Sequence, residues 1–285
     1  MRHLTAELAE VWRFRALFLQ LVRRDLKVRY KNSKLGFVWS IAPPLMQVAC
    51  ITFAFKNATT FAANFDSYSA YVLAAMIPWT YFQTAVLDSS QSILMMYGVI
   101  RKVYMPREII PLATSVSNFI HFAMSWLVFF AYLVFYLRAP LLPTLIWFPV
   151  LVLAQFFLVT AASLVVSCLN VFYEDVKYIV TVLFNLGLFV LPIMYLPEQV
   201  LHSPTMRSLW GGWAARIYMW NPLAVLISGY RKCMLEAPHP SVLGGNAAAP
   251  FDPGSVLAIL GVSFVALVLS YVFFNARKWR FVERP

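Results

Sequence analysis

The chain has 285 residues, of which 61% are hydrophobic, and its formal net charge is +11. Its mean hydropathy is +0.70, and apolar runs of the roughly 20 residues that a membrane helix needs recur along it. This composition excludes an ordinary soluble domain. Because the basic residues stand beside the apolar runs, we interpret the charge as positive-inside topology and attraction to anionic lipids, not as nucleic-acid binding.

The first 35 residues hold nine Lys or Arg residues, which favours a cytoplasmic location. Apolar side chains fill most of the circumference of a helix drawn over this segment, and basic ones share a narrower arc. We therefore predict an amphipathic interface helix over 1–35 that lies in the headgroup plane with its apolar face down. Asp25 and Arg29 stand four apart and could pair. The segment is either a simple membrane anchor or a collar at the cytoplasmic mouth that touches a partner.

Six apolar segments follow that are long enough to cross a membrane. They comprise residues 36–55, 68–87, 109–136, 145–169, 176–196 and 256–274. Six spans leave 17 of the 23 basic residues inside and put both termini in the cytoplasm, whereas an odd count would leave one basic terminus outside. The predicted fold class is all-α integral membrane, with a six-helix transmembrane domain over 36–275 and a basic cytoplasmic tail over 276–285.

Two of the predicted spans carry features that interrupt an apolar helix. Pro43 and Pro44 predict a kink or a late start in the first span, because proline removes a backbone donor and clashes with the preceding turn. The second span is predicted to end near Asp88, whose carboxylate would be costly at mid-membrane and cheap at a wet boundary. The serines that follow it would share that boundary; they are Ser89, Ser90 and Ser92.

The stretch before the last span is unusual for a loop. Asn221 and Pro222 read as an N-cap and a proline at the first helical position. The helix they begin could run to Glu236, which makes it too short to cross the membrane. We predict a re-entrant segment on the outer side, followed by a loop over 237–254.

The sequence lacks the patterns that indicate ATP hydrolysis, metal binding or proton transfer. The phosphate-binding pattern G-x-x-x-x-G-K-[ST] does not occur, so the chain cannot hydrolyse ATP by that route. The four histidines have no metal-ligand spacing. Carboxylates within the predicted spans are too few for a proton relay. We therefore predict that the chain is not an enzyme and carries no cofactor.

Four segments, taken together and in order, resemble the ABC-2 type permeases that export polysaccharides. Residues 24–45 match the pattern R-D-x-K-x-R-Y-x-x-S-x-L-G-x-x-W-x-x-x-x-P-L, and residues 221–231 match N-P-[LM]-x-x-x-x-x-x-[FY]-R. Residues 102–109 and 172–180 are similar to the cytoplasmic loops of that family. Pro43 departs from the family, which often has Asn there.

The resemblance implies a half-transporter for O-antigen, capsule or teichoic acid chains in the bacterial cytoplasmic (inner) membrane. It would pair with a second copy of itself and with two ABC ATPase subunits, which bind the ATP and Mg. Its substrate would be a lipid-linked polysaccharide. The basic loop before the third span would be a short helix that docks on the ATPase, through Ile100, Arg101, Lys102, Val103, Tyr104, Pro106, Arg107 and Glu108.

A glycan channel needs walls that hold sugars weakly, and aromatic rings do so by stacking on them. Aromatic residues make up 16% of the chain, although lipid contact and interfacial belts also use them. We predict that the first, second and fifth spans line the path with Trp39, Trp79, Phe82, Phe184, Phe189 and Tyr195.

Two other functions fit the sequence. One is an ABC-2 permease for a drug or a small lipid, which has the same architecture with a different cargo. The other is an integral membrane glycosyltransferase or acyltransferase that uses His121 or Asp88. Activity of the isolated chain without ATP would favour the transferase.

Overall fold

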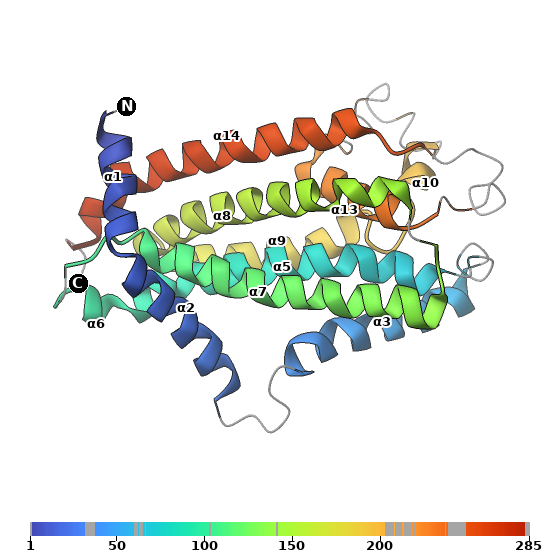
Figure 1. Cartoon of the computed structure of the whole chain (residues 1–285), viewed down its shortest axis with the longest axis horizontal. Coiled ribbons are helices and arrows are strands. Elements are labelled where there is room, and N and C mark those ends of the chain that lie inside the picture. Colours follow the sequence, from blue (N-terminus) through green and yellow to red (C-terminus); the bar gives the residue numbers. More distant parts are fainter. Residues whose placement is uncertain are drawn as a thin grey trace.

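The structure is a computed structural model that describes residues 2–31, 38–59, 67–102, 104–140, 142–202, 220–236 and 249–282, with 62, 65, 208, 213, 218 and 238. All regular elements within these ranges are helical (Figure 1). They are α1 (Arg2–Arg13), α2 (Arg15–Tyr30), α3 (Val38–Ala58), α5 (Tyr68–Met95), α6 (Tyr97–Ile100), α7 (Ile109–Ala131), η1 (Tyr132–Leu137), η2 (Pro143–Trp147), α8 (Phe148–Phe172), α9 (Val176–Val190), α10 (Pro197–His202), α13 (Pro222–Met234), α14 (Pro253–Arg277) and η4 (Lys278–Val282).

Four helices of the described chain are long and apolar enough to cross a membrane, so the chain is a multi-pass membrane protein. They cover Tyr68–Met95, Ile109–Leu137, Pro143–Phe172 and Pro253–Phe281, and each contains one of the predicted spans. Helix α5 lies at the centre, with 78% of its apolar segment buried, and it packs against α7 and α8. Helix α14 lies at the periphery, with 22% buried, and packs along α8.

The predicted first and fifth spans correspond to α3 and α9, which are not among these four. Helix α3 has 21 residues and contains both Pro43 and Pro44, so the prolines do not delay its start. Helix α9 has 15 residues, about 22 Å at 1.5 Å per residue, which is shorter than the hydrocarbon core. The chain leaves the helical conformation at Leu191, which is extended and precedes Pro192. The predicted span to residue 196 was therefore too long.

The helix of the second span continues past its predicted end near Asp88, to Met95. Where this helix leaves the membrane stays a prediction. Ser89 and Ser90 are fully buried within the protein and Ser92 nearly so, so these side chains do not reach water as predicted. The hydroxyl of Ser90 donates to the carbonyl of Leu87 at 2.6 Å. Serine hydroxyls that bond to the preceding turn need no water, and so the helix can continue through them.

The N-terminal segment forms two helices that meet at Phe14, not one. Its apolar face was predicted to rest on lipid, yet part of it packs on the protein. Leu21 and Val22 are buried in a cluster with residues of the 96–113 region. Packing against the chain's own side chains supplies the burial that the headgroup layer would otherwise provide. Helix α2 is thus attached to the body of the protein next to α7.

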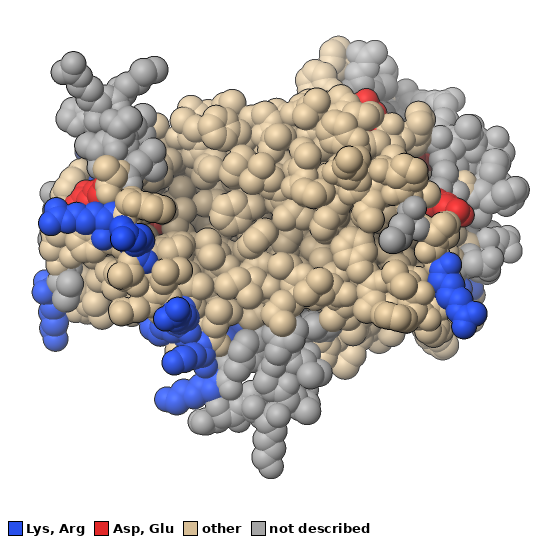
Figure 2. All heavy atoms as spheres, viewed as in Figure 1, with Lys and Arg blue, Asp and Glu red and all other residues tan. Residues whose placement is uncertain are grey.

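Both ends of the chain lie at one end of the bundle, beside α1 and α6 (Figure 1). Figure 2 shows that most of the Lys and Arg side chains visible on this face gather at that end or along α2. We refer to it as the inner end, and to the opposite end, near α10 and α13, as the outer end. Helices α5, α8 and α14 run from the outer end to the inner end and α7 runs the other way, which fits the predicted order of spans.

Candidate functional site

Three of the six aromatic residues predicted to line a channel meet between α5 and α9. The rings of Trp79 and Phe82 stack at 6.4 Å, and Phe184 lies edge-on to them at 5.7 Å and 5.5 Å. Trp79 is 3% exposed and Phe184 9% exposed. Within a single chain these rings therefore contact one another, and Phe82 is the more accessible of the three.

A glycine allows α9 to approach this aromatic cluster closely. A Cβ atom added at Gly187 would lie 2.7 Å from Cη2 of Trp79, nearer than real side-chain contacts come. The separation between α5 and α9 is therefore set by the absence of a side chain at Gly187 and by the size of the indole ring.

The other predicted channel residues lie elsewhere. Phe189 is 66% exposed on α9. Tyr195 is half-buried, and its hydroxyl donates to the carbonyl of Val190 at 2.6 Å and accepts from the hydroxyl of Tyr218 at 3.3 Å. Trp39 falls in α3, but its side chain is outside the described residues.

The predicted ATPase-docking segment is not the short helix expected over 100–108. Helix α6 ends at Ile100, a turn follows at Arg101 and Lys102, and residues 104–106 have no regular structure. Pro106 disfavours a helical conformation at the residue before it, which explains the irregular chain. Val103 lies outside the described residues.

Two side chains of this segment extend outward from the inner end. Tyr104 is 71% exposed, and its hydroxyl donates to Oε1 of Glu10 at 2.7 Å. That carboxylate raises the pKa of Tyr104, so the hydroxyl remains a donor. The guanidinium of Arg101 lies over the ring of Tyr97 at 4.5 Å.

The end of the segment is tied to both ends of the chain through a buried ion pair. Nζ of Lys278 lies 3.2 Å from Oε1 of Glu108 and 3.3 Å from Oε1 of Glu7. Glu108 is fully buried and Lys278 is 6% exposed. Arg107 also donates to the carbonyl of Lys278. Sequence reasoning did not find this junction, because its partners are far apart in the chain.

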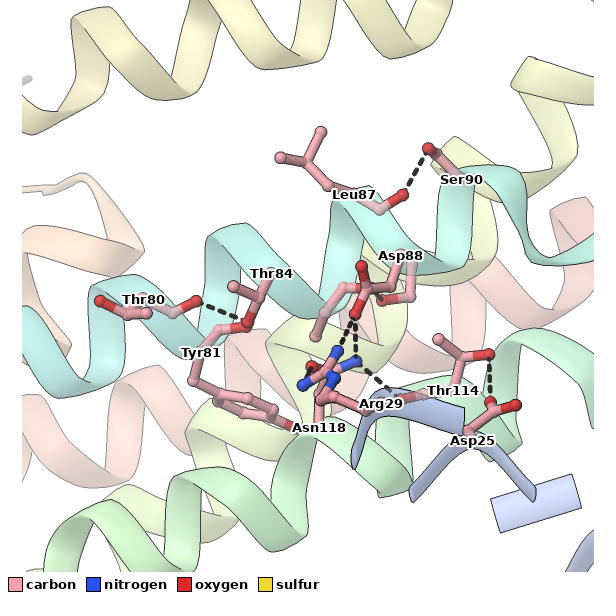
Figure 3. A network of polar contacts seen from close by, with 12 residues as sticks. Asp25, Arg29, Thr80, Tyr81, Thr84, Leu87, Asp88, Ser90, Thr114 and Asn118 are labelled. Atoms are coloured by element: carbon pink, nitrogen blue, oxygen red, sulfur yellow. Dashed lines mark hydrogen bonds and ion pairs between the residues drawn. The ribbon is translucent and has the colours of Figure 1, made fainter. Parts of the chain in front are cut away.

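A second polar network joins α2 to α5 and α7 (Figure 3). Arg29 forms an ion pair with Asp88 and donates to Oδ1 of Asn118 at 3.1 Å. Asn118 donates in turn to Oδ2 of Asp88 at 3.0 Å. Asp25 instead pairs with Arg24 at 2.7 Å and accepts from Thr114 at 3.2 Å. The expected pairing of Asp25 with Arg29 was wrong, because α2 lies on α7 and brings Arg29 within reach of α5.

At the outer end a buried arginine holds three backbone carbonyls. Arg231 is 2% exposed and donates from Nε to the carbonyl of Tyr71 at 2.9 Å, and also to the carbonyls of Pro192 and Ile193. Its guanidinium lies 3.6 Å from the centre of the Tyr71 ring. The carbonyls of Pro192 and Ile193 follow the end of α9, where intrahelical donors are missing.

Helix α13, which carries Arg231, begins as predicted. The backbone N–H of Leu223 donates to Oδ1 of Asn221 at 3.0 Å, and Pro222 occupies the first turn. The helix ends at Met234, slightly before the predicted Glu236. This confirms the short helix; its re-entrant placement in a membrane stays a prediction.

Comparison with known proteins identifies the family. Residues 16–235 match the family described as ABC-2 type transporter. The O-antigen export system permease protein RfbA of Klebsiella pneumoniae is 28% identical over 267 residues, which cover 94% of each chain. The RfbA protein of Myxococcus xanthus is 26% identical over 274 residues, covering 96% of this chain and 97% of that one. The family match spans well over half of the sequence, and the chain therefore belongs to the ABC-2 type transporter family.

Proposed function

We propose that this chain is the transmembrane permease subunit of an ABC exporter that moves a lipid-linked polysaccharide across the bacterial cytoplasmic (inner) membrane. The observation that carries the proposal is the similarity to O-antigen export permeases over nearly the whole of both chains. The missing ATP-binding pattern fits a subunit driven by a separate ATPase. Two copies of this chain and two ATPase subunits would form the transporter.

In this proposal α3 and α9 complete a set of six spans, and the inner end faces the cytoplasm. The concentration of basic residues at that end supports this orientation. Single-cysteine labelling in intact cells, in a background without the native cysteines, tests it. Gly98→Cys should resist a membrane-impermeant thiol reagent and Pro140→Cys should react. Labelling of Gly98→Cys from outside would overturn the six-span arrangement.

The predicted channel belongs to the assembled dimer. The contact of Trp79, Phe82 and Phe184 supports a common aromatic wall between α5 and α9. Phe189, exposed on α9, is free to face a second copy or lipid. We expect Ala at Phe82 or Phe189 to reduce export of the polymer at unchanged protein level. Wild-type export by all six aromatic variants would contradict the aromatic path.

Docking of the ATPase is assigned to the inner segment that ends at Glu108. The exposed ring of Tyr104 and the exposed Arg101 support this assignment. Tyr104→Ala together with Arg101→Ala should leave the chain in the membrane and weaken its association with the ATPase.

The decisive experiment removes this chain from its host. Surface polysaccharide should disappear and lipid-linked polymer should accumulate inside, and the wild-type gene should reverse both effects. Loss of resistance to a drug with normal surface polysaccharide would instead favour a permease for small molecules.

A further inference from the structure

Two hollows meet at the network formed by Arg29, Asp88 and Asn118, one in the inner half of the protein and one near the middle of α5 and α7. The first has a volume of about 480 Å³ and lies between α2, α5 and α7. The second has a volume of about 310 Å³ and lies between α3, α5 and α7. All three network residues line both hollows. Each volume is within the range of small-molecule sites, roughly 300–1,000 Å³.

The charges around the hollows are balanced. Arg24 is paired with Asp25, and Arg29 with Asp88, so each guanidinium already has a carboxylate partner. Figure 3 shows Arg29 and Asp88 pointing toward each other from α2 and α5. An anionic phosphate would have to compete with these carboxylates and would be repelled by them.

Apart from His121 in the second hollow, the remaining polar lining consists of amides and hydroxyls, which suit hydroxyl groups. Gln91 and Ser117 line the first hollow, and Thr84 and Ser125 line the second. Amides and hydroxyls both donate and accept hydrogen bonds, as a sugar hydroxyl does, and carboxylates accept from it. The hydroxyls of Thr84 and Ser125 donate to carbonyls of their own helices at 2.8 Å and 2.9 Å, and their lone pairs remain open to a sugar hydroxyl. A lipid acyl chain has no donor to offer them.

The second hollow also has an apolar wall. Tyr81 and Phe122 line it, with their rings stacked at 4.5 Å. A sugar ring has apolar faces and a polar rim, so aromatic rings beside planar polar groups match both parts of it. Charge balance, neutral hydrogen-bonding groups and an aromatic wall thus favour an uncharged sugar as the ligand.

We propose that Arg29, Asp88 and Asn118 form a binding site for a neutral sugar ring of the exported polymer. The inference rests on the proposed function and specifies where the glycan is held. Asp88 stands about 10 Å along the axis from the inner end of α5, counted at 1.5 Å per residue to Met95. Hydroxyls of the sugar donate to Asp88 and accept from Asn118, and Arg29 links the occupied site to α2.

The test places a photoreactive diazirine amino acid at Gln91, which lies on the rim of the first hollow one turn from Asp88. A matched control carries it at Val262, exposed on α14 and outside both hollows. The full transporter is irradiated in exporting cells. Periodate oxidation and hydrazide tagging then detect any cross-linked glycan by its vicinal diols. Glycan adducts are expected at Gln91 and not at Val262.

Second-site variants assign the binding to the network. Asp88→Asn and Asn118→Leu should each lower the adduct yield at Gln91 about ten-fold, the loss expected for one hydrogen bond to a charged or buried group. Asp175→Asn, an exposed carboxylate away from the hollows, should leave the yield unchanged. Protein level in the membrane is measured for each variant. If Asp88→Asn does not accumulate, the adduct yield of Asn118→Leu alone tests whether the network binds the glycan.

The outcomes separate this inference from the proposed function. Glycan adducts of wild-type yield in both network variants would overturn the site, as would phospholipid adducts alone at Gln91 in cells that export polymer. Normal surface polysaccharide in cells that lack this chain would overturn the proposed function itself.

Discussion

The two ends of the bundle each hold an arginine that joins distant segments, but they use different partners. At the outer end Arg231 is 2% exposed and binds backbone carbonyls on α5 and after α9. At the inner end the Arg29 side chain is 34% exposed and binds side chains on α5 and α7. A backbone carbonyl is held in place by the chain around it, whereas the carboxylate and amide that bind Arg29 are side chains that can rotate away. The outer contact is thus suited to fixing the fold, and the inner one to being broken and remade.

Arg231→Met should produce the largest loss of stability. It removes the side-chain donor of three carbonyls and the cation over the Tyr71 ring, so we expect the free energy of unfolding to fall by about 3–5 kcal/mol. SDS titration of the purified chain in mixed micelles measures it. Arg231→Lys should recover part of the loss, and Arg277→Met, at an exposed arginine of α14, should cost little. Equal stability of the two methionine variants would contradict a structural role for Arg231.

The buried pair of Glu108 and Lys278 tests whether all contacts at the inner end are weak. Breaking it leaves a buried charge, although Lys278 keeps Glu7 as a second partner. We expect Glu108→Gln and Lys278→Met each to cost about 2–3 kcal/mol. The double variant should cost less than the sum by about 1–2 kcal/mol, because the two side chains interact directly. Simple additivity in the same titration would show that the pair contributes nothing to joining the two ends of the chain.

Between the two ends, the fit of α9 against α5 predicts a smaller effect. Gly187→Ala would place Cβ against the Trp79 ring and should cost about 1–3 kcal/mol by overpacking. Gly261→Ala is the matched control, since its Cβ would meet nothing within 4 Å. It should stabilise α14 slightly, because alanine is the better helix former. If both substitutions have the same effect, the close approach of α9 does not depend on Gly187.

The sequence predicted what local chemistry decides. Asn221 and Pro222 begin α13 because a side-chain cap and a fixed φ act within one turn. The apolar runs from residue 68, 109, 145 and 256 are each found within a helix long enough to cross a membrane. Length and hydropathy depend only on neighbouring residues, which is why these features could be read directly.

Tertiary contacts decided what the sequence did not predict. Leu21 and Val22 could have rested on lipid, and only the position of α7 buries them in the protein. Arg29 had Asp25 as its local candidate, yet its partner lies on α5. The rotation of each helix about its axis also determines which aromatic rings meet, and apolar membrane helices carry little periodicity from which to infer it. Trp79 and Phe184 could therefore be assigned to spans but not to a mutual contact.

We expect the smallest effect on stability at Arg29 and Asp88. This pair tests most directly whether the inner contact differs from the Arg231 contact at the outer end. An ion pair this exposed contributes about 0–1 kcal/mol, and salt should weaken it. The free energy of unfolding of Asp88→Asn should therefore differ from that of the wild type by no more than about 1 kcal/mol in the same SDS titration.

A second variant exchanges the two charges, with Arg29→Asp and Asp88→Arg in one chain. It should restore the ion pair that links α2 to α5. The exchange still moves the carboxylate from α5 to α2, so export should stay impaired if a sugar ring binds at Asp88. Full export by the exchanged chain would mean that the pair only holds α2 in place. A large loss of stability in Asp88→Asn would instead make the inner network a structural contact of the same kind as Arg231.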